Sequence, residues 1–147
     1  PMAAGLSLPT ENIDLFRAKL NRQQTLTEKE LTPVTWIDVP MPVSYASKKL
    51  VEQLRVLEPF GKGNEKPVFA DRKLTVRSAN MIGKNKNVLK MQLEDTQGHV
   101  VDAIQFKVEE DMPLRGKEIS IVYYPDINEF RGNQTLQFIV QEWCYTT

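Results

Sequence analysis

Hydrophobic and polar residues alternate in the second half of the chain, which is the pattern of half-buried β-strands. Leu74 and Val76 are separated by Thr75, and the same alternation recurs in four further segments. The residues that should face a core in those segments are Leu89, Met91 and Leu93; Val100, Ile104 and Phe106; Ile119, Ile121 and Tyr123; and Leu136, Phe138 and Val140. The pattern therefore predicts five strands within residues 67–143.

The segments between these strands indicate how the strands connect. Residues 83–86 and 96–98 are short polar turns, which suit antiparallel hairpins. Residues 108–117 form a longer connection between the third and fourth strands, where we expect a helix, and residues 125–133 join the last two strands. Five antiparallel strands with a long third connection predict the OB fold, a small β-barrel that holds its ligand on strands two and three and the neighbouring loops.

The first third of the chain has a different pattern, with apolar residues at helical spacing. We expect a helix over residues 10–22, a short strand over residues 35–39, and a second helix that begins at Ser44 or Ser47 and ends before Pro59. The apolar positions that define these helices are Ile13, Phe16 and Leu20, with Thr10 as N-cap, and then Leu50, Leu54 and Leu57. This helix–strand–helix segment has too little apolar surface to fold alone.

The apolar pattern changes from helical spacing to strand alternation at residues 57–64, where two glycines and an asparagine suit a turn with positive φ. We place a domain boundary there. The predicted fold class is α+β, with the helix–strand–helix segment in residues 1–58 and a five-stranded antiparallel OB-fold β-barrel in residues 59–147.

Composition indicates the class of protein and the cellular compartment. Hydrophobic residues at 41% and charged residues at 26% are ordinary for a globular domain. No apolar run approaches the roughly 20 residues that cross a bilayer, and the single Cys144 fits a reducing compartment. We expect a cytoplasmic protein with no membrane partner. Because the chain begins at Pro1 rather than methionine, we also expect a fragment of a longer protein.

The charge of the chain is balanced overall but uneven along its length. Nineteen Lys and Arg residues offset nineteen Asp and Glu residues, so the whole molecule exerts no long-range attraction on a polyanion. Residues 72–90 nevertheless contain no acidic residue and six cations: Arg72, Lys73, Arg77, Lys84, Lys86 and Lys90. On charge alone a solvated surface is the more common explanation, and nucleic-acid contact is the alternative.

The residues that enzymes use for hydrolysis are scarce in this chain. His99 and Cys144 are single, which excludes a zinc site built from several histidines or cysteines. The densest acidic run, Glu109-Glu110-Asp111, resembles a solvated loop more than a two-metal centre. No phosphate-binding loop or nucleophile elbow is present. We therefore predict no catalytic residue, no metal ligand and no cofactor in this chain.

A nucleic-acid-binding surface is better supported, because cations and an aromatic ring fall on the loops that flank the predicted OB face. Such a surface can hold phosphates with cations and stack bases on rings. The predicted nucleic-acid-binding residues are Lys73, Arg77, Lys84, Lys86, Lys90, Gln92, Phe130, Arg131 and Asn133. Phe130 either stacks on a base or folds back over the barrel. Tyr124 either faces outward or packs on the first part of the chain.

Several short motifs, spread over nearly the whole chain, point to one protein family. The most specific is Leu57-Glu58-Pro59-Phe60-Gly61, followed by Gly63-Asn64. Others are residues 2–8, Ile37-Asp38 near Pro40, Val88-Leu89-Lys90, residues 102–106 and residues 128–133. Together these motifs resemble the carboxyl-terminal region of RecJ, the bacterial single-strand-specific DNA exonuclease.

The resemblance implies a division of labour. In that family a DHH phosphoesterase core holds manganese or magnesium, a DHH-associated domain helps to bind substrate, and an OB domain grips single-stranded DNA. Residues 1–58 would be the tail of the associated domain, and residues 59–147 the OB domain. The family's Gly-Gly-His would precede Ala3-Ala4-Gly5, so no catalytic residue is carried over and the fragment alone is expected to be inactive.

The resemblance also suggests partners and a process. Single-stranded DNA and the remainder of a 5′-to-3′ exonuclease are the expected partners, in DNA repair and recombination. The alternative is a barrel that contacts proteins, such as single-stranded-DNA-binding protein. The sequence leaves open the preference for DNA or RNA and the strand polarity.

Overall fold

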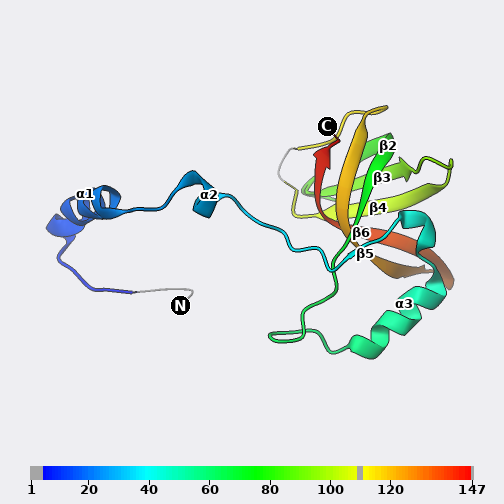
Figure 1. Cartoon of the computed structure of the whole chain (residues 1–147), viewed down its shortest axis with the longest axis horizontal. Helices are drawn as coiled ribbons and strands as arrows, with labels where there is room; N and C mark the ends of the chain where they lie inside the picture. Colours follow the sequence, from blue (N-terminus) through cyan, green and yellow to red (C-terminus); the bar gives the residue numbers. More distant parts are fainter. Residues whose placement is uncertain (1–4, 109–110, 147) are drawn as a thin grey trace. The chain divides into compact units, whose positions relative to one another are not determined.

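The computed structural model describes residues 5–108 and 111–146 and contains two compact units, Pro1–Thr35 and Trp36–Thr147 (Figure 1). The first unit holds three short helices: η1 (Thr10–Asn12), α1 (Ile13–Gln23) and α2 (Glu28–Leu31). No residue of these helices is buried. The helix predicted over residues 10–22 is confirmed, but Thr10 is not its cap, since this residue begins the 3-10 turn and makes no side-chain cap bond.

The second unit begins with short elements that lead into the sheet. They are β1 (Val39–Pro40), η2 (Val43–Tyr45), α3 (Lys48–Leu54) and η3 (Arg55–Leu57). The strand predicted over residues 35–39 is mostly wrong, because only Val39–Pro40 pairs with another strand. The second predicted helix is confirmed as α3, which η3 continues to Leu57. Its N-cap is Ser47, whose hydroxyl accepts a hydrogen bond from the Leu50 N–H at 3.2 Å.

Five long strands complete the unit, as the alternation predicted. They are β2 (Phe69–Ile82), β3 (Val88–Glu94), β4 (Val100–Phe106), β5 (Glu118–Phe130) and β6 (Asn133–Tyr145). The sheet order is β1-β2-β3-β4-β6-β5, and β2 also pairs with β5, so the five long strands form a closed ring (Figure 1). The prediction of purely antiparallel strands is wrong at one pairing, since β4 and β6 run parallel. β5 and β6 form an antiparallel hairpin. Its second strand, β6, pairs with the edge of β4 that β3 does not occupy, and it runs in the same direction as β4.

The core lies inside the ring and follows the predicted alternation in four strands. Its most buried large side chains include Leu74, Leu89, Met91, Leu93, Ile119, Ile121, Tyr123 and Phe138. The prediction for β4 is wrong, because Val100 and Phe106 are each 54% exposed and Ala103 is buried instead. Ala103 pairs with the buried Met91, and paired residues face the same side. β4 carries apolar residues on both faces, so its partner strand decides which face is buried.

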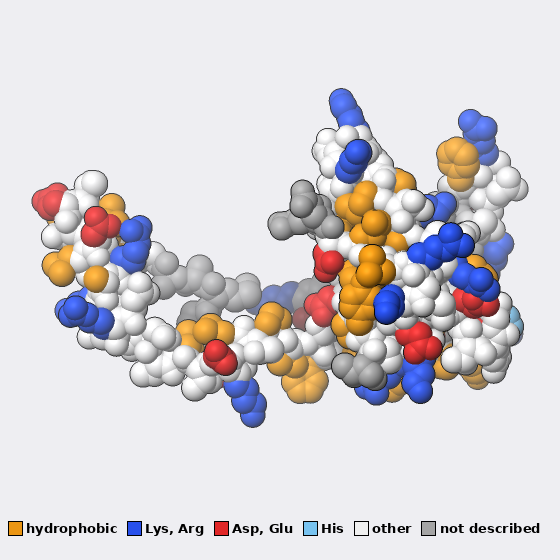
Figure 2. All heavy atoms as spheres, turned by 90° about the horizontal axis from the view of Figure 1, so that it is seen from above, with side chains coloured by type: hydrophobic (Ala, Val, Ile, Leu, Met, Phe, Trp, Pro, Cys, Tyr) orange, Lys and Arg blue, Asp and Glu red, His pale blue; other side chains and the backbone are white. Residues whose placement is uncertain are grey.

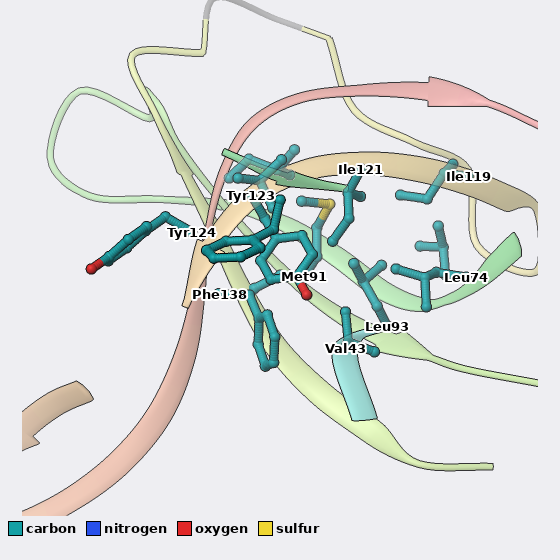
Figure 3. Packing of buried hydrophobic residues seen from close by; sticks show 14 of the residues in the cluster. Val43, Leu74, Met91, Leu93, Ile119, Ile121, Tyr123, Tyr124 and Phe138 are labelled. Atoms are coloured by element: carbon teal, nitrogen blue, oxygen red, sulfur yellow. The ribbon is translucent and has the colours of Figure 1, made fainter. Parts of the chain in front are cut away.

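Two adjacent tyrosines on β5, Tyr123 and Tyr124, point in different directions. A β-bulge shifts the register between Val122 and Tyr123. The Tyr123 ring packs 5.2 Å from the Phe138 ring, and its hydroxyl donates to the Met41 carbonyl at 2.8 Å. Figure 3 shows Tyr124 pointing away from this pair. Tyr124 thus turns outward from β5, as one alternative predicted, but it is only 4% exposed because its ring packs 6.3 Å from the Phe60 ring.

The connections agree with the sequence at the short turns and differ at the long ones. Turns occur at residues 83–86 and 96–98, as predicted. The helix expected in residues 108–117 does not occur in the described part of that segment. Residues 125–133 are not a loop, because β5 and β6 remain paired up to Phe130 and Asn133 and leave only Arg131 and Gly132 as the turn.

The hydrogen bond from Tyr123 to the Met41 carbonyl ties the segment before α3 to the ring. We predict that Tyr123→Phe lowers the free energy of unfolding in urea by about 1–3 kcal/mol, because the carbonyl stays buried without a partner. Tyr145→Phe is the matched control. The Tyr145 hydroxyl accepts a hydrogen bond from the Leu114 N–H at 3.1 Å, but both residues are exposed, so water can replace the hydroxyl and the loss should stay below about 0.5 kcal/mol. Equal losses in the two variants would contradict this role for Tyr123.

Candidate nucleic-acid interface

The outer face of β2, β3 and β4 is built of cross-strand rows, because paired residues project to the same side of a sheet. The pairings give three rows across this face: Ile82, Val88 and Phe106; Asn80, Lys90 and Ile104; and Ser78, Gln92 and Asp102. Lys90 and Gln92 are exposed there, as the sequence predicted. We call this surface the β3–β4 face.

The β3–β4 face combines apolar surface with a central cation. Phe106 is 54% exposed and Ile82 is 39% exposed, so the first row offers hydrophobic contact at the surface. Phe106 is absent from the predicted site because the alternation in β4 assigned it to the core. The pairing of β4 with β3 could have identified Phe106 as a surface residue, since Phe106 is paired with Val88 rather than with a core residue.

A basic turn borders one end of the β3–β4 face. The Lys86 N–H donates to the Gly83 carbonyl at 3.1 Å and closes the turn between β2 and β3. The Val108 N–H donates to the Asn87 carbonyl at 3.0 Å, which holds the end of β4 beside this turn. Lys84 and Lys86 are exposed, and Lys107 joins them as an exposed cation that the sequence did not single out. These three lysines are adjacent to the Phe106 row.

The tip of the β5–β6 hairpin borders the other end. β4 and β6 are parallel, so the start of β6 lies toward the start of β4 and away from the basic turn. Phe130 is 64% exposed, and the Arg131 guanidinium lies 5.1 Å from the centre of its ring. Asn133 pairs with Phe130 at the base of the two-residue turn. Of the two alternatives for Phe130, the structure excludes a ring folded back over the core.

The remaining predicted residues either interact with an acidic residue of the chain or lie apart from the basic turn. Arg77 forms an ion pair with Glu94, and this hydrogen bond raises the pKa of Arg77. Gln92 donates to Asp102 at 3.4 Å. Lys73 lies at the bulge between β2 and β5, away from the basic turn at the opposite end of β2.

Lys73 instead lines a separate open groove of about 490 Å³ on β2, β5 and β6. Arg72 and Ser120 also line this groove. Asp71 contributes a carboxylate there, but both of its oxygens accept backbone hydrogen bonds, from Val43 and from Arg72. The lining of the groove therefore contains two cations, Arg72 and Lys73, and two acids, Asp71 and Glu142.

Charge is distributed unevenly over the larger unit. Figure 2 shows a stripe of hydrophobic side chains on that unit, with Lys and Arg side chains scattered around it. On the β3–β4 face, Lys90 and the basic turn lie toward one end, whereas Asp102 lies in the row beyond Lys90. A polyanion would therefore be held most strongly near the Phe106 row.

Neither a metal centre nor a transmembrane helix is found in the described parts of the chain. Within residues 5–108 and 111–146, no three His, Cys, Asp or Glu side chains gather as metal ligands. No helix among these residues is long and apolar enough to cross a membrane. Glu109 and Glu110, two members of the acidic run noted in the sequence, lie outside the described residues.

Comparison with known proteins identifies relatives of the whole chain. Residues 37–142 match the family model of the RecJ OB domain. The single-stranded-DNA-specific exonuclease RecJ of Haemophilus influenzae is 35% identical over 144 residues, which cover 95% of this chain and 25% of that protein. RecJ of Bacillus subtilis is 30% identical over 146 residues, which cover 97% of this chain and 18% of that protein. The chain thus spans a quarter or less of the length of these relatives.

Solved structures show the same fold. RecJ from Thermus thermophilus, in its complex with Mn2+, superposes with a TM-score of 0.69 at 16% identity over 96% of this chain and 20% of that one. Its complex with Mg2+ gives a TM-score of 0.65 at 17% identity. The closed ring of strands and the family match agree, and the chain belongs to the RecJ OB domain family.

Proposed function

We propose that this chain is the single-stranded-DNA-binding part of a RecJ-like exonuclease of DNA repair and recombination. The observation that carries the proposal is the β3–β4 face, where exposed Phe106 and Lys90 lie between the basic turn and the hairpin tip. Unpaired bases have exposed ring faces that aromatic side chains can stack on, and phosphates favour cations. A single strand offers both groups to this surface.

The proposed contacts predict modest affinity. Four cations that the sequence singled out, Lys84, Lys86, Lys90 and Arg131, lie along the face. If each neutralises one phosphate, the logarithm of the binding constant falls with the logarithm of salt concentration with a slope of about −3, at about −0.7 per phosphate. Such a surface holds substrate for an enzyme rather than sequestering it.

The chemistry is proposed to belong to the rest of the parent protein. RecJ relatives are named as exonucleases, and this chain covers a quarter or less of their length. We propose a parent 5′-to-3′ exonuclease, cytoplasmic and using manganese or magnesium, with this fragment inactive by itself. Residues 1–58 are proposed to be the tail of its DHH-associated domain. The compact unit and the family model begin earlier than this boundary, at Trp36 and residue 37.

A protein-binding role is the second candidate, and exposed apolar residues favour it. Trp36 and Val56 are each 84% exposed, and Tyr45 is 76% exposed, all outside the β3–β4 face. Large apolar side chains at the surface are common at protein contacts. The rest of the parent enzyme or single-stranded-DNA-binding protein would be the partner.

The first test of DNA binding removes the loop cations. We predict that Lys84→Ala/Lys86→Ala/Arg131→Ala weakens binding of a fluorescent single-stranded oligonucleotide and reduces the salt slope by about 2, because three phosphate contacts are lost. Titration by fluorescence anisotropy at several salt concentrations measures both quantities.

The matched control removes the same charge from connections outside the β3–β4 face. Lys62→Ala/Arg115→Ala/Lys117→Ala should retain the wild-type slope, because these exposed residues lie before β2 and between β4 and β5 rather than on that face. Wild-type chain that fails to bind at low salt, or equal effects in the two triple variants, would refute the proposal.

A second test separates free cations from paired ones. We predict that Lys90→Ala weakens oligonucleotide binding and lowers the salt slope by about 0.7. Arg77→Ala/Glu94→Ala removes an ion pair whose charges already offset each other, so affinity should remain near that of the wild type. A larger loss in the double variant than in Lys90→Ala would show that the ligand follows a different path.

A further inference from the structure

Every non-glycine residue with a left-handed backbone in the described part of the chain is a cation. These residues are Lys73 (φ 60°), Lys86 (φ 48°), Lys107 (φ 58°) and Arg131 (φ 51°). Lys and Arg make up 19 of the 147 residues, so composition alone would rarely give four cations at four such positions.

These positions are ones where other residue types are favoured. An L side chain with a left-handed backbone places its Cβ too close to the neighbouring carbonyl, so Gly, Asn and Asp are the usual occupants. Arg131 and Gly132 form the two-residue turn of the β5–β6 hairpin, where Asn-Gly is the common pair. Lys73 occupies the register shift between β2 and β5, and bulges often have glycine at such a residue.

Interactions within the chain do not explain these choices. All four residues are exposed. Among the residues that the structure describes, none of the four takes part in an ion pair. Arg131 contacts the neighbouring Phe130 ring, but that ring is itself 64% exposed. The strain is therefore not offset by burial or pairing of these side chains. Strained residues cluster where a ligand is held.

We propose that Lys73, Lys86, Lys107 and Arg131 are phosphate contacts, kept at strained positions because binding of a polyanion requires a cation there. This inference rests on the proposed function and deepens it. It adds Lys107 to the binding surface, and it makes the groove lined by Lys73 a second contact for the same strand, beyond the β3–β4 face. The chain is less stable because of the strain at these four positions and binds the polyanion more tightly because of their charge.

Lys86 and Lys107 are placed to bind the same phosphate, because a hydrogen bond joins the segments that follow them. The Val108 N–H donates to the Asn87 carbonyl at 3.0 Å, which places the residues after Lys86 and Lys107 side by side. Both flank the row that contains exposed Phe106. A phosphate held between the two lysines would leave its base near that ring.

Glycine and alanine variants separate strain from charge. Lys86→Gly/Lys107→Gly removes two charges and also the two strained Cβ atoms, whereas Lys86→Ala/Lys107→Ala removes the same charges and keeps the strain. We expect the glycine pair to raise the Tm of the full chain by about 2–4 °C over the wild type, and the alanine pair to give no rise. Both pairs should bind a single-stranded oligonucleotide more weakly, with the salt slope reduced by about 1.4.

The outcomes distinguish this inference from the proposed function. A glycine pair that is more stable but binds as tightly as the wild type would overturn the inference, because the strained cations would then have no binding role. A glycine pair that is no more stable than the alanine pair would also overturn it, because no stability would have been given up. In either case the wild-type chain would still bind DNA, whereas failure of the proposed function would be absence of that binding.

Discussion

The register of β3 between β2 and β4 is the constraint on which the rest of the structure depends. Side chains alternate along a strand, so one register that buries Leu89, Met91 and Leu93 also turns Lys90 and Gln92 outward. A shift by one residue would exchange the two sets. Because the paired strands follow the same register, the position of Phe106 at the surface is a consequence of the core and not a separate feature.

The same constraint explains how the molecule can bury an apolar core and still present a surface with both apolar and charged residues. The ring closes through the pairing of β2 with β5, so each of its five strands has two neighbouring strands without any partner on the β3–β4 face. Turns at the ends of the strands carry Lys84, Lys86 and Arg131. Those turns accept strained residues because the closed ring holds the strands on either side of them, and the proposed phosphate contacts would set stability against binding there.

Much of the fold could be predicted from the sequence, and the failures have physical causes. Alternation identified the five strands because most have only one apolar face, but β4 is apolar on both, and only its pairing with β3 reveals which is buried. Residues 125–133 looked like a loop because Pro125 and the polar residues after it suit turns, yet pairing with β6 extends the hairpin through them. Lys107 was missed because proximity to the basic turn depends on a hydrogen bond between distant segments.

The most direct test of the account is the change in amide chemical shifts when a short single-stranded oligonucleotide is added to the isotope-labelled chain. Binding on the β3–β4 face predicts the largest changes at Lys90, Ile104 and Phe106, in residues 83–87 and at Arg131, with little change in α3. Changes centred on Trp36, Tyr45 and Val56, or no changes at low salt, would contradict it.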